Sequence, residues 1–90
     1  MNFTAKDLAR ILGGTIEGDP EIEVNSVAKI EEGCIGNLCF LANEKYTNHI
    51  YTTNASIIIV NNSFHLEKDI KATLIKVDDA HSSFSQLLEI

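Results

Sequence analysis

The stretch ASIIIV, residues 55–60, is the feature that most restricts how this chain can fold. Its apolar side chains run without a polar break, whereas a strand with one face in water alternates apolar and polar residues. Such a run is typical of a strand buried on both faces, which requires layers of structure on each side of a sheet. The run is far shorter than the roughly 18 residues that a membrane-spanning helix needs.

The rest of the chain predicts helices and strands around this one. Thr4-Ala5-Lys6-Asp7 forms a capping box, which predicts a first helix that ends at Gly13-Gly14. Its expected buried stripe consists of Leu8, Ile11 and Leu12. Further strands are expected on either side of the turn at 18–20, through 26–30, at 37–42 and at 73–77. Further helices are expected at 44–53 and after Asp78 or Asp79. The last helix should carry Ala80, Phe84, Leu87 and Leu88 on one face. Loops are expected at 31–36 and 61–71.

This order of elements predicts the α/β class, with a small single-layer mixed sheet of about five strands and flanking helices. The 90 residues, 44% of them hydrophobic, suffice for one domain over 1–90. The last helical pattern reaches Ile90 without a C-cap glycine or a polar tail. We therefore expect this chain to be part of a longer protein.

Charge and sorting signals narrow the function classes. The net charge is −6, and the seven Lys and Arg residues are scattered singly, so no basic patch for nucleic acid or anionic lipid is expected. The start MNFTAKDLAR carries charge early and lacks the apolar region of a secretory signal. A soluble, cytoplasmic protein is therefore expected.

No catalytic or metal-binding pattern is found. His49, His65 and His81 lack metal-ligand spacing, and Cys34 and Cys39 form neither a CxxC pair nor a disulfide framework. Free thiols in a reducing compartment are expected. On residues alone, the chain is interpreted as a binding or structural module without catalytic residues, metal or cofactor.

The stretch FLANEKY, residues 40–46, carries the clearest functional signal. Phe40 ends a strand, Asn43 is placed to cap the following helix, and Tyr46 is its third residue. All three could surround one mouth at the carboxyl end of the strand, where ligands of α/β sheets often bind. Ordinary structural roles are the alternative, because Asn is a preferred cap, Phe often lies in the core and Tyr often covers a sheet edge.

Over essentially its whole length the chain resembles the N-terminal domain of the UDP-3-O-acylglucosamine N-acyltransferases of lipid A biosynthesis. The resemblance is carried by FTAKDLARILGGTIEGDPEIEV, SVAKIEEGCIGNLCFLANEKY, ASIIIV and TLIKVDDAHSSFSQLL. Departures from the usual pattern are Asn37 for Asp, Cys39 for Ser or Thr, and Glu44 for Pro. None of them touches the aromatic–Asn–aromatic triple.

The resemblance implies that 1–90 is a uridine-binding domain for UDP-3-O-(3-hydroxyacyl)glucosamine. It implies that Phe40 and Tyr46 offer aromatic faces to uracil and that Asn43 reads the edge of the base. Lys45 is a candidate phosphate contact, although a solvated lysine at a helix start is the alternative.

The resemblance also implies what lies outside this chain. Acyl transfer from acyl carrier protein to the glucosamine amine occurs on a left-handed β-helix with a His base, in a trimer. That β-helix is absent here, so these 90 residues alone are expected to be non-catalytic and monomeric.

Two alternative interpretations are considered, and one sequence feature bears on each. A Mur ligase N-terminal domain also meets a uridine nucleotide, but it usually carries a Ser-Arg pair before the glycine turn, which SVAKIEEG lacks. A protein-interaction module would need an exposed apolar patch, for which the last helix is a candidate.

Overall fold

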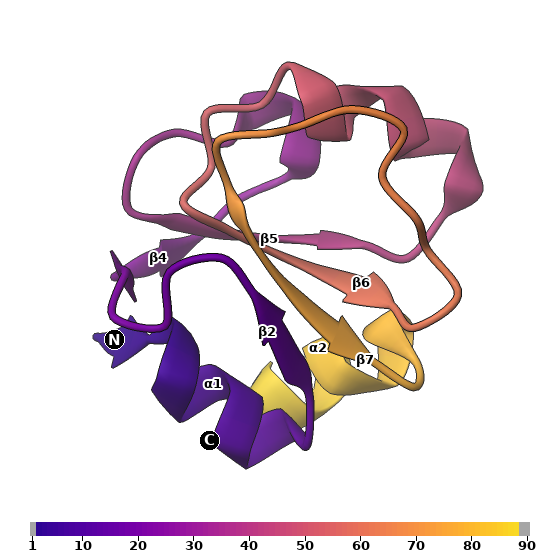
Figure 1. Cartoon of the computed structure of the whole chain (residues 1–90). Coiled ribbons are helices and arrows are strands. Elements are labelled where there is room, and N and C mark those ends of the chain that lie inside the picture. The colour runs from indigo at the N-terminus through magenta and orange to yellow at the C-terminus, as the bar shows by residue number, and fades with distance from the viewer. Residues whose placement is uncertain (1, 89–90) are drawn as a thin grey trace.

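A computed structural model describes residues 2–88, whose centre is a five-stranded mixed sheet (Figure 1). Its strand order is β2-β7-β6-β5-β4. The strands are β2 (Thr15–Glu17), β4 (Ser26–Val27), β5 (Asn37–Leu41), β6 (Ile57–Asn61) and β7 (Thr73–Val77). β4, β5, β6 and β7 are parallel in chain order, and β2 is antiparallel to β7. The predicted α/β class with a mixed sheet of about five strands is confirmed.

The apolar run that most restricted the fold becomes β6, the central strand of the sheet. Ile57, Ile58, Ile59 and Val60 are all fully buried. Ile57 and Ile59 face one core cluster, and Ile58 and Val60 face another. The expectation of a strand buried on both faces is therefore confirmed, because each face of the sheet carries its own covering layer.

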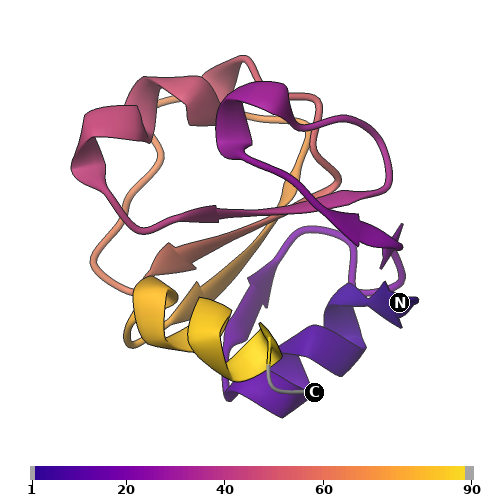
Figure 2. The same ribbon diagram turned by 180° about the vertical axis from the view of Figure 1, so that it is seen from behind.

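One face of the sheet, called here the helical face, is covered by two α-helices, α1 (Ala5–Leu12) and α2 (Ala80–Leu88) (Figure 2). Leu8 from α1 and Leu87 from α2 pack with Leu38 and Ile75 of the sheet. A separate two-stranded ribbon, β1 (Phe3–Thr4) with β3 (Glu23–Val24), lies beside α1 and adds Val24 to the same cluster.

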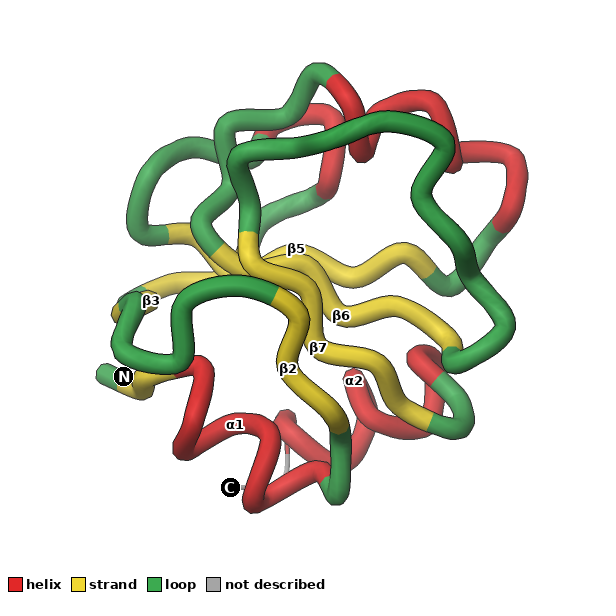
Figure 3. The backbone as a smooth tube through the Cα atoms, viewed as in Figure 1, coloured by secondary structure: helices red, strands yellow, loops and turns green. Residues whose placement is uncertain are grey.

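The opposite face, called here the crossover face, is covered by the connections between the parallel strands (Figure 3). These are the 3₁₀ helix η1 (Ile30–Glu32), the 3₁₀ helix η2 (Glu44–Tyr51) and the irregular segment 62–72. Ile30 and Ile50 pack there against Cys39 and Ile58. The loop expected over 31–36 is confirmed only beyond η1. The connection expected over 61–71 is irregular from residue 62, because Asn61 is the last residue of β6.

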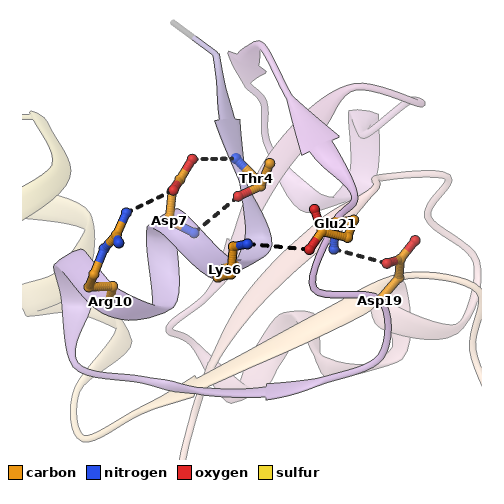
Figure 4. A network of polar contacts seen from close by, with 6 residues as sticks. All are labelled: Thr4, Lys6, Asp7, Arg10, Asp19 and Glu21. Carbon is orange, nitrogen blue, oxygen red and sulfur yellow. Dashed lines mark hydrogen bonds and ion pairs between the residues drawn. The ribbon is translucent and has the colours of Figure 1, made fainter.

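The predicted start of α1 is present in full (Figure 4). The Asp7 amide donates to the Thr4 hydroxyl at 3.1 Å, and the Thr4 amide donates to the Asp7 carboxylate at 3.3 Å. Gly13 ends the helix in the left-handed conformation, with φ 69°. The predicted buried stripe needs correction, because Ala5, Leu8 and Ala9 are buried while Ile11 and Leu12 are only partly so. The small alanines let α1 lie close to the sheet.

The segment predicted as a helix over 44–53 is a 3₁₀ helix that ends at Tyr51. Its turns are closed by bonds between residues three apart, such as the Tyr46 amide to the Asn43 carbonyl at 3.0 Å. Thr47 donates its hydroxyl to the Glu44 carbonyl at 2.7 Å. Thr, Asn and Tyr are weak α-helix formers, and such side-chain bonds compete with the α-helical pattern. These two effects account for the 3₁₀ geometry of η2 in place of an α-helix.

Two further expectations are refined. The strands on either side of 18–20 do not pair with each other, because β2 joins β7 and β3 joins β1. In α2, Ala80 and Leu87 are buried as expected, but Leu88 is 66% exposed and Ser83 is buried in its place. Asp79 is the cap, since its carboxylate accepts from the His81 amide at 3.0 Å. The expected run of the helix into Glu89 and Ile90 lies outside the described residues.

Within residues 2–88, no helix is long and apolar enough to cross a membrane.

Candidate functional site

The candidate site lies where β5 ends and the chain turns into η2. β5 alternates its side chains between the two faces, so that Phe40 packs with the helical-face core and Leu41 with the crossover-face core. Ala42 and Asn43 follow, both exposed at the edge of the sheet. This edge carries the carboxyl ends of all four parallel strands, which is where α/β sheets commonly bind ligands.

Asn43 caps η2, as predicted. Its side-chain oxygen accepts a hydrogen bond from the Lys45 amide at 3.0 Å, and its carbonyl accepts one from the Tyr46 amide at 3.0 Å. Among the described residues, no hydrogen bond uses the Nδ2 group of Asn43. An amide nitrogen has two protons to donate, and an amide oxygen has a second lone pair. The exposed cap therefore retains the capacity to donate and to accept at the sheet edge.

Phe40 and Tyr46 pack on opposite faces of the sheet. The Phe40 ring lies against Phe84 of α2, with centroids 4.7 Å apart and an interplanar angle of 79°. The Tyr46 ring packs partly into the crossover-face core and lies 6.0 Å from the His49 ring. Because Asn43 stands between them at the edge, the three residues surround that edge and do not line one cavity.

The helical-face cavity is a depression of about 380 Å³ beside Phe40. The end of β4, the end of β5 and the start of α2 form its walls, and its lining consists of Val27, Ala28, Lys29, Phe40, Ala42, His81 and Phe84. Its volume lies within the roughly 300–1,000 Å³ of typical small-molecule sites. Two aromatic rings and two basic residues therefore meet in one hollow.

The crossover-face cavity is a second depression, of about 430 Å³, on the other side of Ala42. It is more polar, and its lining consists of Leu41, Ala42, Glu44, Thr47, Asn61, Ser63, Phe64 and His65. The two cavities share Ala42, directly before Asn43. A cavity therefore lies on each face of the sheet at the edge that these two residues form.

Lys45 lines neither of these cavities. Its ammonium group lies over the Tyr46 ring, 5.5 Å from the centroid. A cation above an aromatic face is attracted by the ring electrons. In this structure Lys45 therefore lies over one face of the Tyr46 ring.

Titration of the nearby groups follows from their surroundings. Burial in the crossover-face core, next to Cys34 and Glu31, raises the pKa of the Cys39 thiol to about 11. The Ser82 hydroxyl is the main cause that lowers the pKa of Asp79 below its usual value. Both cysteines are free, as expected, and the structure places Cys34 at the surface and buries Cys39. Within 2–88, no group of three or more His, Cys, Asp or Glu residues is arranged to hold a metal ion.

Sequence reasoning did not place Lys29, His81 and Phe84 at this site. The sequence pattern predicts an extended segment around Lys29 and places the other two in the final helix. The sequence pattern does not reveal the parallel pairing of β4 with β5, in which Val27 lies opposite Leu38. Because the carboxyl ends of neighbouring parallel strands meet at one edge, that pairing would have placed Lys29 beside Phe40.

Comparison with known proteins gives consistent matches. A model of the family described as UDP-3-O-(3-hydroxymyristoyl) glucosamine N-acyltransferase, LpxD, matches residues 21–90. A UDP-3-O-acylglucosamine N-acyltransferase of Christiangramia forsetii is 57% identical over 99% of this chain and 26% of its own length. Proteins of the same name from Bacteroides thetaiotaomicron and Phocaeicola vulgatus are 49% and 48% identical over 100% of this chain and 26% of theirs. The chain thus spans about a quarter of the length of these relatives.

Proposed function

Because the chain belongs to the UDP-3-O-acylglucosamine N-acyltransferase family, we propose that residues 1–90 bind the uridine end of the nucleotide-sugar substrate within a longer enzyme. The observation that carries the proposal is the sheet edge at Ala42 and Asn43, hollowed from both faces and flanked by Phe40 and Tyr46. The family match gives no support to the Mur ligase alternative.

Asn43 is the group suited to read the base. The Watson–Crick edge of uracil presents an acceptor, a donor and a second acceptor. The Nδ2 group of Asn43 can donate to a uracil carbonyl, and the second lone pair of its Oδ1 can accept from the uracil N–H. The cap bond to the Lys45 amide fixes the orientation of the side chain before the ligand arrives. Such preorganisation lowers the entropy cost of binding.

Phe40 and Tyr46 supply aromatic surface from opposite sides. Since they pack on opposite faces of the sheet, a base that meets both rings must lie across the edge at Asn43. Base stacking on an aromatic ring contributes about 1–3 kcal/mol. The two rings and the amide together form a site for a planar base with a polar edge.

Acyl transfer itself is proposed to lie outside these residues. The complete enzyme would move a 3-hydroxyacyl group from acyl carrier protein to the glucosamine amine in lipid A biosynthesis, in the cytoplasm and as a trimer. In that arrangement this domain contributes substrate affinity. It needs no cofactor for that role.

An interaction module has less support. Among the described residues, the exposed large apolar side chains are Val27, Ile35 and Leu88. They come from β4, a turn and the end of α2, and single exposed apolar residues are ordinary on protein surfaces.

The proposal is tested by substituting Asn43 in the intact enzyme and measuring kcat and KM for the nucleotide sugar. Asn43→Asp keeps an oxygen for the cap and removes both amide protons, so its carboxylate repels the uracil carbonyls. We expect KM to rise about tenfold with kcat nearly unchanged, because loss of uniform binding raises KM alone. Asn43→Ser, which can also cap, should show a smaller rise.

Phe40→Ala and Tyr46→Ala should each raise KM by about five- to hundredfold through lost stacking. Ile35→Ala is the matched surface control, since Ile35 is 89% exposed and lies on a distant turn. Circular dichroism checks that each variant is folded. An unchanged KM in a folded Asn43→Asp enzyme would show that Asn43 is only a helix cap.

A further inference from the structure

Phe84 of α2 is a large aromatic residue whose place in the structure is not explained by the hydrophobic core. The helical-face core takes Ala80 and Leu87 from α2, and their exposed fractions are 0% and 7%. Phe84 lies between them in sequence, yet within residues 2–88 it is only partly buried and belongs to neither core cluster. Its ring instead lies against Phe40 and lines the helical-face cavity.

The Phe40 ring needs such a neighbour because one flank of its strand is open. On one side Phe40 pairs with Ile59 of β6. On the other side the pairing of β5 with β4 ends at Val27 opposite Leu38, and the helical-face cavity borders Phe40 there. A phenylalanine side chain can change rotamer about two bonds unless its surroundings restrict it. The contact with Phe84 supplies a restriction that the sheet does not provide on this side.

α2 is held well enough to keep the Phe84 ring in place. At its start, the Ala80 amide donates to the Asn61 side-chain oxygen at 2.7 Å, which ties the helix to the end of β6. Near its end, the Gln86 Nε2 group donates to the Ile11 carbonyl of α1 at 3.2 Å. Phe84 lies between these two contacts, so its position is determined by the fold before any ligand binds.

The geometry of the two rings suits a supporting role. Their planes are 79° apart with centroids separated by 4.7 Å, which is the edge-to-face arrangement that aromatic pairs favour. Both rings still line the helical-face cavity, so the contact leaves aromatic surface of Phe40 accessible from it. A ring that is already oriented when a planar ligand arrives lowers the entropy cost of stacking.

We propose that Phe84 is a positioning residue of the base site, which holds the Phe40 ring in the orientation on which the base stacks. The proposal rests on the proposed uridine site, because Phe84 acts on the ligand through Phe40. It gives α2 a part in substrate binding in addition to its part in covering the sheet.

The test measures UDP binding and kinetics in the intact enzyme. Phe84→Leu removes the ring and keeps an apolar side chain. We expect its dissociation constant for UDP, measured by calorimetry, and its KM for the nucleotide sugar to rise about two- to tenfold with kcat nearly unchanged, which is the range expected for one lost edge-to-face pair. Phe84→Tyr keeps the ring and should restore both constants.

Leu87→Ala is the matched control for a purely structural effect. Leu87 lies on the same helix and packs into the helical-face core, but it does not line the cavity. The substitution should lower the midpoint of urea unfolding at least as much as Phe84→Leu does, while UDP binding stays unchanged. Equal weakening of UDP binding by Leu87→Ala would show that any loosening of α2 disturbs the site, and the assignment to Phe84 would be wrong.

A double-mutant cycle with Phe40→Ala tests whether Phe84 acts through Phe40. If it does, adding Phe84→Leu to Phe40→Ala weakens UDP binding no further. The proposal is overturned if Phe84→Leu weakens UDP binding by the same factor in both backgrounds. It is also overturned if Phe40→Ala weakens UDP binding and Phe84→Leu does not. Unchanged UDP binding in Phe40→Ala is a different result, which overturns the uridine site and this proposal together.

Discussion

The helical face and the crossover face of the sheet bury neighbouring residues of the same strands, yet they are covered in different ways. Two regular α-helices cover the helical face, and α1 begins with a complete capping box. Two 3₁₀ helices and the irregular segment 62–72 cover the crossover face. Ile58 and Ile59 are adjacent and equally buried, but they meet these two kinds of cover.

The difference follows from the topology. Each parallel pair of strands needs a connection that returns along the sheet, and here all three returns run over one face (Figure 1). The helices are then free to fill the other face. 3₁₀ turns have poorer hydrogen-bond geometry than α-helices, so the crossover face is expected to open and relax more readily. The candidate site lies where the two kinds of cover meet.

The largest effects are expected from Ile59→Ala and Ile58→Ala, which remove the same atoms from opposite faces of β6. Loss of a buried isoleucine side chain costs about 2–5 kcal/mol, and the cost falls when the surroundings can close the cavity. We expect about 4 kcal/mol for Ile59→Ala and about 2–3 kcal/mol for Ile58→Ala in urea denaturation. An equal or larger cost for Ile58→Ala would show that the crossover face is as rigid as the helical face.

A smaller contrast is expected from Gly14→Ala and Gly33→Ala. A Cβ at Gly14 would lie 2.7 Å from Ile75 Cγ2 and 2.8 Å from the Lys76 carbonyl oxygen. Both atoms belong to β7, which is paired on both sides and cannot move away. A Cβ at Gly33 would lie 2.6 Å from the Thr53 hydroxyl and 2.8 Å from Ala55 Cβ, in irregular chain. Overpacking costs about 1–3 kcal/mol, so we expect the upper end for Gly14 and the lower end for Gly33. Thermal unfolding measures both, and a reversed order would contradict the comparison.

The smallest effects are expected in the dependence of stability on pH, where the two faces respond at opposite ends of the scale. Hydrogen bonds from the backbone and hydroxyl of Thr4, with the charge of Arg10, lower the pKa of Asp7. A lowered pKa in the folded state gives stability that is present above the ordinary value of 3.8 and is lost as the pH falls through the folded value. Asp7→Asn should therefore flatten the acid limb of the stability curve.

On the crossover face the sign is reversed. The pKa of Cys39 rises from its ordinary 9.0 to about 11 in the folded state, so stability is full below pH 9 and falls as the pH rises from 9 to 11. Cys39→Ala should flatten that alkaline limb while leaving the acid limb unchanged. Chemical denaturation at a series of pH values checks both variants, and identical curves for Cys39→Ala and wild type above pH 9 would contradict the buried-thiol account.

The range of the interactions along the chain explains which parts of the fold could be predicted from the sequence. The capping box of α1 and the apolar run of β6 act through neighbours in the chain, so their local patterns were sufficient. The pairing of β2 with β7 and of β1 with β3 depends on distant segments and was not predicted. The 3₁₀ geometry of η2 depends on side-chain bonds such as that of Thr47, which apolar periodicity does not report.

The residues of the candidate site also differ in whether local sequence signals predict their positions. The position of Asn43 as a cap at the end of β5 could be predicted, because both the strand and the cap are local signals. The placement of Phe40 and Tyr46 on opposite faces follows from the tertiary path of η2, which the sequence pattern left open. Lys29 and Phe84 come together at one cavity only through the parallel pairing of β4 and the docking of α2.

The pairing of β2 with β7 also has a consequence for the order of events during synthesis. Thr15 lies opposite Lys76, so the first strand of the sheet must wait for nearly the last before it has a partner. Until then α1 also lacks Ile75 and Val77 of β7, which belong to the core cluster that it packs into. Chains emerge from the ribosome at about 5–20 residues per second, so the N-terminal segment is left unpaired for several seconds. A chaperone that holds nascent chains would find β2 without its partner strand during this interval, and the sheet is complete only when β7 has been made.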